Sequence, residues 1–249
     1  MFGNPKSSAA LILGIVATLV IVGFAGLIGV ELYARHLANS KVAGAVQCEA
    51  QDSARVSFGT TPPVLWQYFT SHYSNISAET AGNQVRSAKG MKINIAIQNV
   101  QLSNTDNSKG TIGALNGTIT WTASGIKESI QDAVPVLGKF VTSEVTPNPS
   151  DGTIELKGLL DTATVKPQIV NNGLSLEVVS LNALGSDMST EKVQQHLDDL
   201  TSKATQNYPL GIHADSVAVT STGVEATFST SNAAIPSGGG STDPCFANI

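Results

Sequence analysis

Hydrophobic and polar positions divide this chain into one long apolar run near its start and many short periodic segments after it. No charged residue occurs between Ala9 and Val30. A helix over residues 9–30 would be about 33 Å long, which matches the hydrocarbon core of a bilayer. The run therefore predicts a transmembrane helix, preceded by residues 1–8 as a short cytoplasmic N-terminus and followed by a folded domain.

A cleaved signal peptide is the alternative interpretation of this run. The apolar region of a signal peptide usually has about 7–15 residues, and a small-x-small cleavage site follows it closely. The triplet Ala43-Gly44-Ala45 has this form, but it lies beyond Glu31 and Arg35. We therefore expect an uncleaved signal anchor and a single-pass protein of the cell membrane.

The cysteines indicate on which side of the membrane the domain lies. Lys6 precedes the apolar run while Arg35 and Lys41 follow it, so the positive charges favour neither orientation clearly. Cys48 and Cys245 stand near opposite ends of the domain, which suits a disulfide formed in an oxidising compartment. Two unrelated free thiols are the alternative. We expect the disulfide, and a domain on the extracytoplasmic (periplasmic) side.

Segments of alternating apolar residues predict antiparallel strands. Met91, Ile93, Ile95 and Ile97 alternate with polar or small residues, which is the period of a strand with one dry face. The tripeptide Asn171-Asn172-Gly173 is typical of a tight hairpin. We expect strands at residues 54–58, 91–102 and 113–121, three more between residues 154 and 178, and a final hairpin of residues 212–220 with 224–228.

Other segments have helical spacing. The Pro62-Pro63 pair predicts a helix from Val64 to about Ser71. Two further helices are predicted by apolar residues spaced three or four apart, which include Ile126 and Ile130 in one helix and Val193, Leu197 and Leu200 in the other. Together these elements predict an α+β fold in which a curved antiparallel sheet wraps around amphipathic helices. We expect this domain to cover residues 31–234, followed by a Gly/Ser linker and Cys-containing tail at residues 235–249.

Composition excludes several function classes. Charged residues make up 13% of the chain and the net charge is −5, so a nucleic-acid interface is not expected, because phosphate binding needs a basic face. The four His and two Cys show no metal-ligand spacing, and no cofactor-binding motif is present. A carbohydrate-active enzyme would need paired carboxylates. Candidates are Glu155, Asp161 and Asp215, but we expect them to be solvated surface charges.

The apolar faces allow two interpretations. Small residues at Gly113, Gly117 and Ala163 leave space along the sheet, which could enclose an acyl chain. An ordinary dry core explains the same pattern equally well. The residues alone leave both open.

A family resemblance favours the first interpretation. The run from Val56 to Trp66, Lys109-Gly110-Thr111-Ile112-Gly113, Trp121 with Gly125-Ile126, and Pro209-Leu210-Gly211-Ile212 with Gly223-Val224 resemble the LmeA-like phospholipid-binding family of actinobacterial cell envelopes. The resemblance covers roughly residues 35–230. It implies a fold similar to tubular lipid-binding domains and an extracytoplasmic location. It also implies binding of phospholipid or phosphoinositide, and a role in lipoglycan or envelope biogenesis.

We therefore predict a membrane-anchored phospholipid-binding protein that is not an enzyme and has no cofactor, metal or nucleic-acid partner. A structural or interaction subunit of an envelope assembly, with a closed core, is the alternative. The residues expected to line the lipid site are Leu65, Trp66, Phe69, Ile93, Ile95, Ile97, Leu115, Ile119, Trp121, Ile126, Ile130, Leu176, Val178, Leu197 and Leu200.

Overall fold

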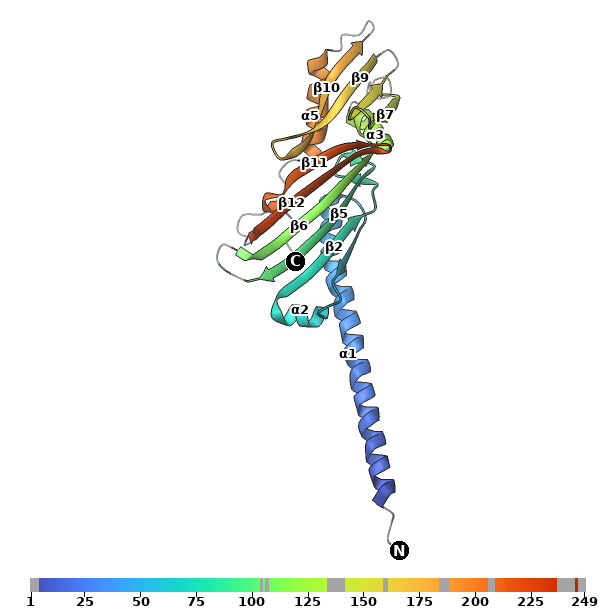
Figure 1. Ribbon diagram of the computed structural model, residues 1–249, viewed down its shortest axis with the longest axis vertical. Helices are drawn as coiled ribbons and strands as arrows, with labels where there is room; N and C mark the ends of the chain where they lie inside the picture. Colours follow the sequence, from blue (N-terminus) through green and yellow to red (C-terminus); the bar gives the residue numbers. More distant parts are fainter. Residues whose placement is uncertain are drawn as a thin grey trace.

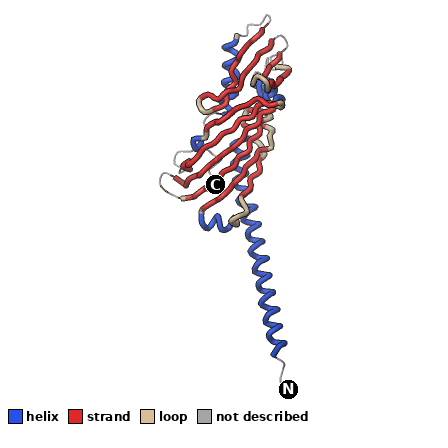
Figure 2. The backbone as a smooth tube through the Cα atoms, viewed as in Figure 1, coloured by secondary structure: helices blue, strands red, loops and turns tan. Residues whose placement is uncertain are grey.

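The computed structural model describes residues 5–103, 105, 108–133, 142–158, 161–183, 189–205, 209–236 and 245. Helices occur together with purely antiparallel sheets, which confirms the predicted α+β class. The molecule is elongated, with the long helix α1 (Pro5–Ala50) projecting from one end and a four-stranded sheet at the other (Figures 1 and 2). The predictions for residues 1–4 and for the Gly/Ser linker at residues 237–241 lie outside the described residues.

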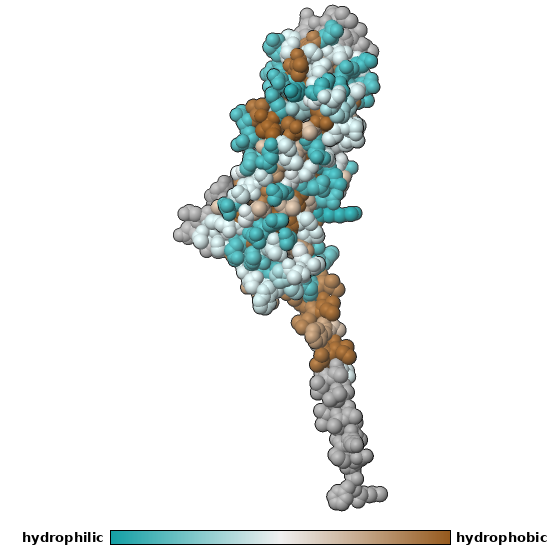
Figure 3. Space-filling view, in the orientation of Figure 1, coloured by the Kyte–Doolittle hydropathy of each residue, from teal (hydrophilic) through white to brown (hydrophobic). Residues whose placement is uncertain are grey.

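Helix α1 runs without a break from the apolar segment into the domain. Its described part includes a stretch long and apolar enough to cross a membrane. The large hydrophobic side chains between Val20 and Val30 are exposed, and Figure 3 shows the part of α1 just below the domain as hydrophobic. Farther along α1, Ala38 and Val42 pack beside β1 (Ala54–Phe58).

The larger sheet has six strands in the order β1-β2-β5-β6-β12-β11, and every neighbouring pair is antiparallel. Its other strands are β2 (His72–Thr80), β5 (Met91–Leu102), β6 (Ser108–Thr122), β11 (His213–Thr220) and β12 (Gly223–Pro236). The strands predicted at residues 54–58, 91–102 and 113–121 and the final hairpin are all confirmed. Strand β2 and the small hairpin of β3 (Gln84–Val85) with β4 (Ala88–Lys89) were not predicted from the sequence.

The smaller sheet has four strands in the order β10-β9-β8-β7. They are β7 (Glu144–Asn148), β8 (Thr153–Lys157), β9 (Asp161–Val170) and β10 (Gly173–Ala183). The predicted turn between β9 and β10 is confirmed, since Asn171 and Asn172 have φ values of 50° and 66°, as a two-residue type I′ hairpin requires. Strand β7 was not predicted because Pro147 interrupts it. Proline is tolerated there because β7 is an edge strand.

The other helices in the described part of the chain are α2 (Val64–Thr70), α3 (Ala123–Ala133) and α5 (Thr190–Thr205), together with the short 3-10 turn η1 (Pro209–Gly211). Helix α5 packs on β10, and α3 lies between the two sheets, where it contacts β4, β6 and β7. Most buried hydrophobic residues of both sheets and both helices form one core, while Val56, Phe58, Val64 and Ala78 form a second cluster beside α1. Neither sheet is closed, so the predicted wrapping of one curved sheet around amphipathic helices is not confirmed.

The disulfide between Cys48 and Cys245 is present, as predicted, and its two Cα atoms are 5.4 Å apart. Cys48 lies near the C-terminal end of α1, whereas Cys245 follows the last strand of the chain. The bond therefore ties the C-terminal segment back to the helix that enters the domain.

Candidate functional site

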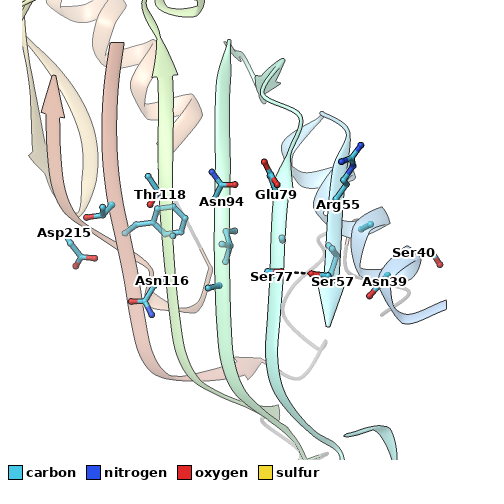
Figure 4. A pocket seen from close by; sticks show the side chains of 18 of the residues that line it. Asn39, Ser40, Arg55, Ser57, Ser77, Glu79, Asn94, Asn116, Thr118 and Asp215 are labelled. Carbon is cyan, nitrogen blue, oxygen red and sulfur yellow. Dashed lines mark hydrogen bonds between the residues drawn. The ribbon is translucent and has the colours of Figure 1, made fainter. Parts of the chain in front are cut away.

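A groove of about 1090 Å³ lies between α1 and the six-stranded sheet. Small-molecule sites usually have volumes of about 300–1,000 Å³, so this groove is large enough for a sizeable ligand. Figure 4 shows Asn39 and Ser40 of α1 on one side of the groove and Asp215 of β11 on the other. The lining residues are His36, Asn39, Ser40, Ala43, Arg55, Val56, Ser57, Ser77, Ala78, Glu79, Asn94, Ile95, Ala96, Asn116, Gly117, Thr118, Asp215, Thr227 and Phe228.

One cross-strand row supplies most of the apolar lining. Val56 of β1 is paired with Ala78, Ala78 with Ile95, and Ile95 with Gly117. Gly117 is paired in turn with Phe228 of β12. The side chains in this row therefore belong to the same face of the sheet. Ala78 belongs to β2, which was not predicted, so this part of the site was not predicted either. The alternation of Ile76, Ala78 and Thr80 could have indicated the strand.

The space expected at Gly117 is not empty. A Cβ atom at this position would collide with the ring of Phe228, which is itself buried. Gly117 thus allows the aromatic ring to lie directly on the backbone of β6, and the expected gap is filled from the neighbouring strand. Likewise, a Cβ atom at Gly113 would meet the Asn99 side chain.

The exposed side chains of the groove are polar. Ser57 and Ser77 form a hydrogen bond of 2.7 Å between their Oγ atoms across β1 and β2 (Figure 4). Asn94 and Asn116 are exposed on β5 and β6. Because successive side chains of a strand point to opposite faces, these hydroxyl and amide groups lie on the face opposite the apolar row of Val56, Ala78 and Ile95.

Charges of both signs lie at the groove. Arg55 and Glu79 face each other on β1 and β2, and Glu79 also forms an ion pair with Lys92. The hydrogen bond and the charge of Lys92, aided by the charge of Arg55, lower the pKa of Glu79 below its ordinary value. Glu79 is therefore anionic at neutral pH and offsets part of the positive potential of Arg55.

The α1 side of the groove carries an unsatisfied polar atom. Asn39 Oδ1 is shielded from solvent and has no hydrogen-bond partner among the described residues. Buried polar groups are usually paired. A hydrogen-bond donor on a ligand in the groove would satisfy this acceptor, which neither composition nor spacing could indicate.

The structure brings only one of the predicted lipid-binding residues, Ile95, to the groove. Ile93 and Ile97 are half-buried two residues away on the same strand. The next group lies buried in the common core instead: Leu115, Ile119, Trp121, Ile126 and Ile130. The last group belongs to the smaller sheet and the helix packed on it: Leu176, Val178, Leu197 and Leu200.

The residues predicted on α2 do not reach the groove either. Trp66 is 62% exposed and Phe69 is 78% exposed, whereas Leu65 is half-buried. The physical reason is that α2 buries Val64 and Gln67 instead. The Gln67 side chain donates hydrogen bonds to the carbonyl oxygens of residues 59 and 62. Because the hydrogen bonds of Gln67 orient its side of α2 toward the protein, Trp66 and Phe69 point toward solvent.

The carboxylates considered for catalysis are not gathered together. Glu155 is exposed on β8, and Asp215 lies at the groove on β11, in the other sheet. Asp215 accepts from the imidazole of His213, with 3.2 Å between Nε2 and Oδ1. The side chain of Asp161 lies outside the described part. Among described residues, no group of three or more His, Cys, Asp or Glu is placed to hold a metal ion.

Comparison with known proteins gives one family and three close relatives. The sequence model of the LmeA-like phospholipid-binding family matches residues 29–229. Uncharacterized proteins of Mycobacterium tuberculosis, strains H37Rv and CDC 1551, and of Mycobacterium bovis are each 59% identical over 239 residues. The match covers 96% of this chain and 67% of each relative. No solved structure matches.

Proposed function

The chain belongs to the LmeA-like phospholipid-binding family, and from this premise we propose that it is a membrane-anchored protein that holds a phospholipid in the groove between α1 and the six-stranded sheet. The observation that carries the proposal is the apolar row that faces α1. Val56, Ala78, Ile95 and Phe228 share one face of the sheet, and Ile95 is only half-buried. An acyl chain suits this surface, while the polar side chains of Asn39 and Ser40 line the α1 side of the groove.

We place the acyl part of the lipid against Ile95, with Ile93 and Ile97 as neighbouring contacts. These side chains are half-buried, so a ligand can still remove apolar area from water. Each methylene that becomes buried contributes about 0.8 kcal/mol. Contact with only a few methylenes would therefore offset much of the cost of ordering the lipid.

We place the headgroup near Arg55 and Asn39. Arg55, on the edge strand β1, supplies a guanidinium, which pairs well with phosphate. Asn39 supplies an unpaired amide oxygen, which accepts a hydrogen bond from a hydroxyl or ammonium group of the headgroup. A phosphoinositide would add ring hydroxyls, for which Asn39 and Ser40 of α1 offer partners. The neighbouring Glu79 limits the preference for multiply charged headgroups, so we favour a single phosphodiester as the recognised group.

We further propose that α1 is an uncleaved anchor with the domain outside the cytoplasm. Glu31 and Arg35 hydrogen-bond to the domain, and Ala45 is 4% exposed. Cleavage at the small-x-small triplet ending at Ala45 would remove these contacts. The Cys48–Cys245 disulfide favours an oxidising compartment. On this arrangement the protein supports lipid handling or lipoglycan and envelope biogenesis.

The groove would then lie close to the bilayer. Its α1 wall begins at His36 and ends at Ala43, which is about 9–20 Å along the helix from Val30 at the helical rise. A lipid could therefore remain near the membrane surface while it contacts the groove.

The test is to purify the full-length chain in detergent and to identify retained lipids by mass spectrometry. Ile95→Trp should reduce retained phospholipid several-fold, because it fills the apolar row. Val179→Trp is the matched control, since Val179 is 57% exposed on the other sheet, and it should retain wild-type amounts. Folded wild-type protein that neither retains phospholipid nor takes it up from vesicles would overturn the proposal and favour the interaction-subunit alternative.

A further inference from the structure

Helix α2 presents three aromatic side chains to the outside of the protein. Trp66 is 62% exposed, Tyr68 is 67% exposed and Phe69 is 78% exposed. We call these three residues the aromatic foot. Tyr68 and Phe69 contact each other edge to face, with ring centroids 5.9 Å apart. Aromatic side chains are seldom left in water as a group, so this patch indicates an interaction surface.

The foot is fixed to α1 at the point where the apolar segment ends. Val30 is the last residue of the uncharged run, and the next residue, Glu31, accepts hydrogen bonds from the backbone N–H groups of Val64 and Leu65 at 2.7 and 3.0 Å. Arg35, one turn later, donates to the carbonyl oxygen of Phe58 at 2.7 Å. Figure 1 shows α2 at the end of the sheet from which α1 projects.

Two further exposed residues lie at the same level. Leu32 is 61% exposed and Tyr33 is 69% exposed on α1, immediately after the apolar run. Trp and Tyr are the side chains that concentrate at membrane–water interfaces, because they combine an apolar ring with a polar group. The foot carries one of each, together with a phenylalanine.

We propose that the aromatic foot inserts into the interfacial region of the same bilayer that α1 spans. The occupant is thus a lipid surface, because the first turn of α2, the helix that carries the foot, is hydrogen-bonded to Glu31, the first residue beyond the apolar run. The inference rests on the anchoring part of the proposed function. It adds a second attachment point, which stops the domain from swivelling freely about α1 and fixes the direction in which the groove faces.

The two tryptophans allow a direct test. Trp121 is 1% exposed and its Nε1 donates to the carbonyl oxygen of Lys89 at 2.9 Å, so it reports the core, while Trp66 reports the foot. The full-length chain is reconstituted into vesicles of phosphatidylethanolamine and phosphatidylglycerol that carry bromine near the top of the acyl chain or near its end. Bromine near the top should strongly quench wild-type fluorescence, and bromine near the end should quench it less.

The variant Trp66→Phe, which keeps Trp121, should lose most of that quenching. A Trp66 signal that brominated lipid leaves unchanged would overturn the proposal. This includes the case in which Trp66 is shielded by a second copy or another protein. Retained phospholipid is measured on the same detergent-purified chain. Absent quenching with retained lipid refutes the foot alone, and normal quenching without retained lipid refutes the groove alone.

Discussion

The carboxylate of Glu31 accepts a hydrogen bond of 2.7 Å from the backbone N–H of Val64. It accepts another from Leu65, so a side chain of α1 satisfies the first turn of α2. Pro63, which precedes that helix, provides no side-chain cap, and the first N–H groups of any helix need partners. Glu31, thirty-three positions before Val64 in the sequence, thus acts as the N-terminal cap of α2.

Glu31→Ala should therefore loosen α2. Loss of an N-terminal cap costs about 0.5–2 kcal/mol, and the variant also removes the ion pair with Arg35. We expect faster hydrogen exchange at Val64 and Leu65, measured by mass spectrometry on the full chain in detergent. Glu225→Ala changes an exposed carboxylate on β12 and should leave exchange in α2 unchanged. Equal protection in both variants would contradict the capping role.

Loss of the disulfide should lower stability substantially. The bond joins residues separated by 197 positions, and the loop-entropy relation gives a stabilisation of roughly 5 kcal/mol for a loop of this size. Cys245→Ser should lower the denaturant midpoint of the full chain in detergent. Non-reducing peptide mapping of the membrane fraction supplies the independent check, and recovery of both cysteines as free thiols would refute the bond and weaken the external orientation.

Asp52, just after α1, should give an acid-sensitive contribution to stability. Burial raises its pKa, but hydrogen bonds from the Asn83 side chain and from the Asn83, Ser53 and Gly82 backbone outweigh burial, and the pKa lies below the ordinary value of 3.8. Because the pKa of Asp52 is lower in the folded protein than in the unfolded chain, its stabilising contribution is complete above the ordinary pKa of 3.8. This contribution is lost as the pH falls through the lower pKa of the folded protein. The melting-temperature difference between wild type and Asp52→Asn should thus shrink in acid. A constant difference would contradict this expectation.

Gly117→Ala tests the close approach of Phe228 to the floor of the groove. The new methyl group would displace the ring, and overpacking of this kind typically costs about 1–3 kcal/mol. Thermal unfolding should show this loss. Gly44→Ala is a suitable control because its Cβ would meet nothing within 4 Å on a helix, where the change stabilises by up to about 1 kcal/mol. Similar melting temperatures for the two variants would exclude the steric role of Gly117.

The alternative of a carbohydrate-active enzyme predicts an essential carboxylate. Glu155 is exposed, and Asp198 is an exposed residue of α5 that accepts from Gln194 at 2.8 Å. Substitution of either by Ala should change stability by less than about 0.5 kcal/mol and leave phospholipid retention unchanged. Complementation of a deletion strain measures cellular function. Loss of function by a folded variant would require the non-enzymatic interpretation to be abandoned.

The sequence predicted elements where one face is consistently dry, as in β5, and where turn chemistry is specific, as at Asn171-Asn172. It did not predict β7, because Pro147 breaks the pattern on an edge strand, where its missing N–H costs little. The groove was less predictable than the elements. Apolar periodicity identifies a dry face, but only tertiary packing decides which row of that face stays accessible, and this row contains Ile95 rather than Ile119.

The aromatic residues of α2 illustrate the same limit. Trp66 and Phe69 are usually core residues by composition. In a seven-residue helix, however, one buried and hydrogen-bonded amide can determine which face points inward. In α2 this amide belongs to Gln67, which is fully buried. No periodicity in so short a segment could distinguish a polar residue that is buried and fully bonded from one that faces water.

The bond between Cys48 and Cys245 also affects what a protease can release. Every loop of the domain lies between these two residues, so the chain from one to the other is a covalent ring attached to α1. A single cut in any of those loops opens the ring without freeing a fragment. A nicked molecule would migrate as two pieces only after reduction, and shedding of the domain would require two cuts, one cut together with reduction, or a cut in α1 before Cys48.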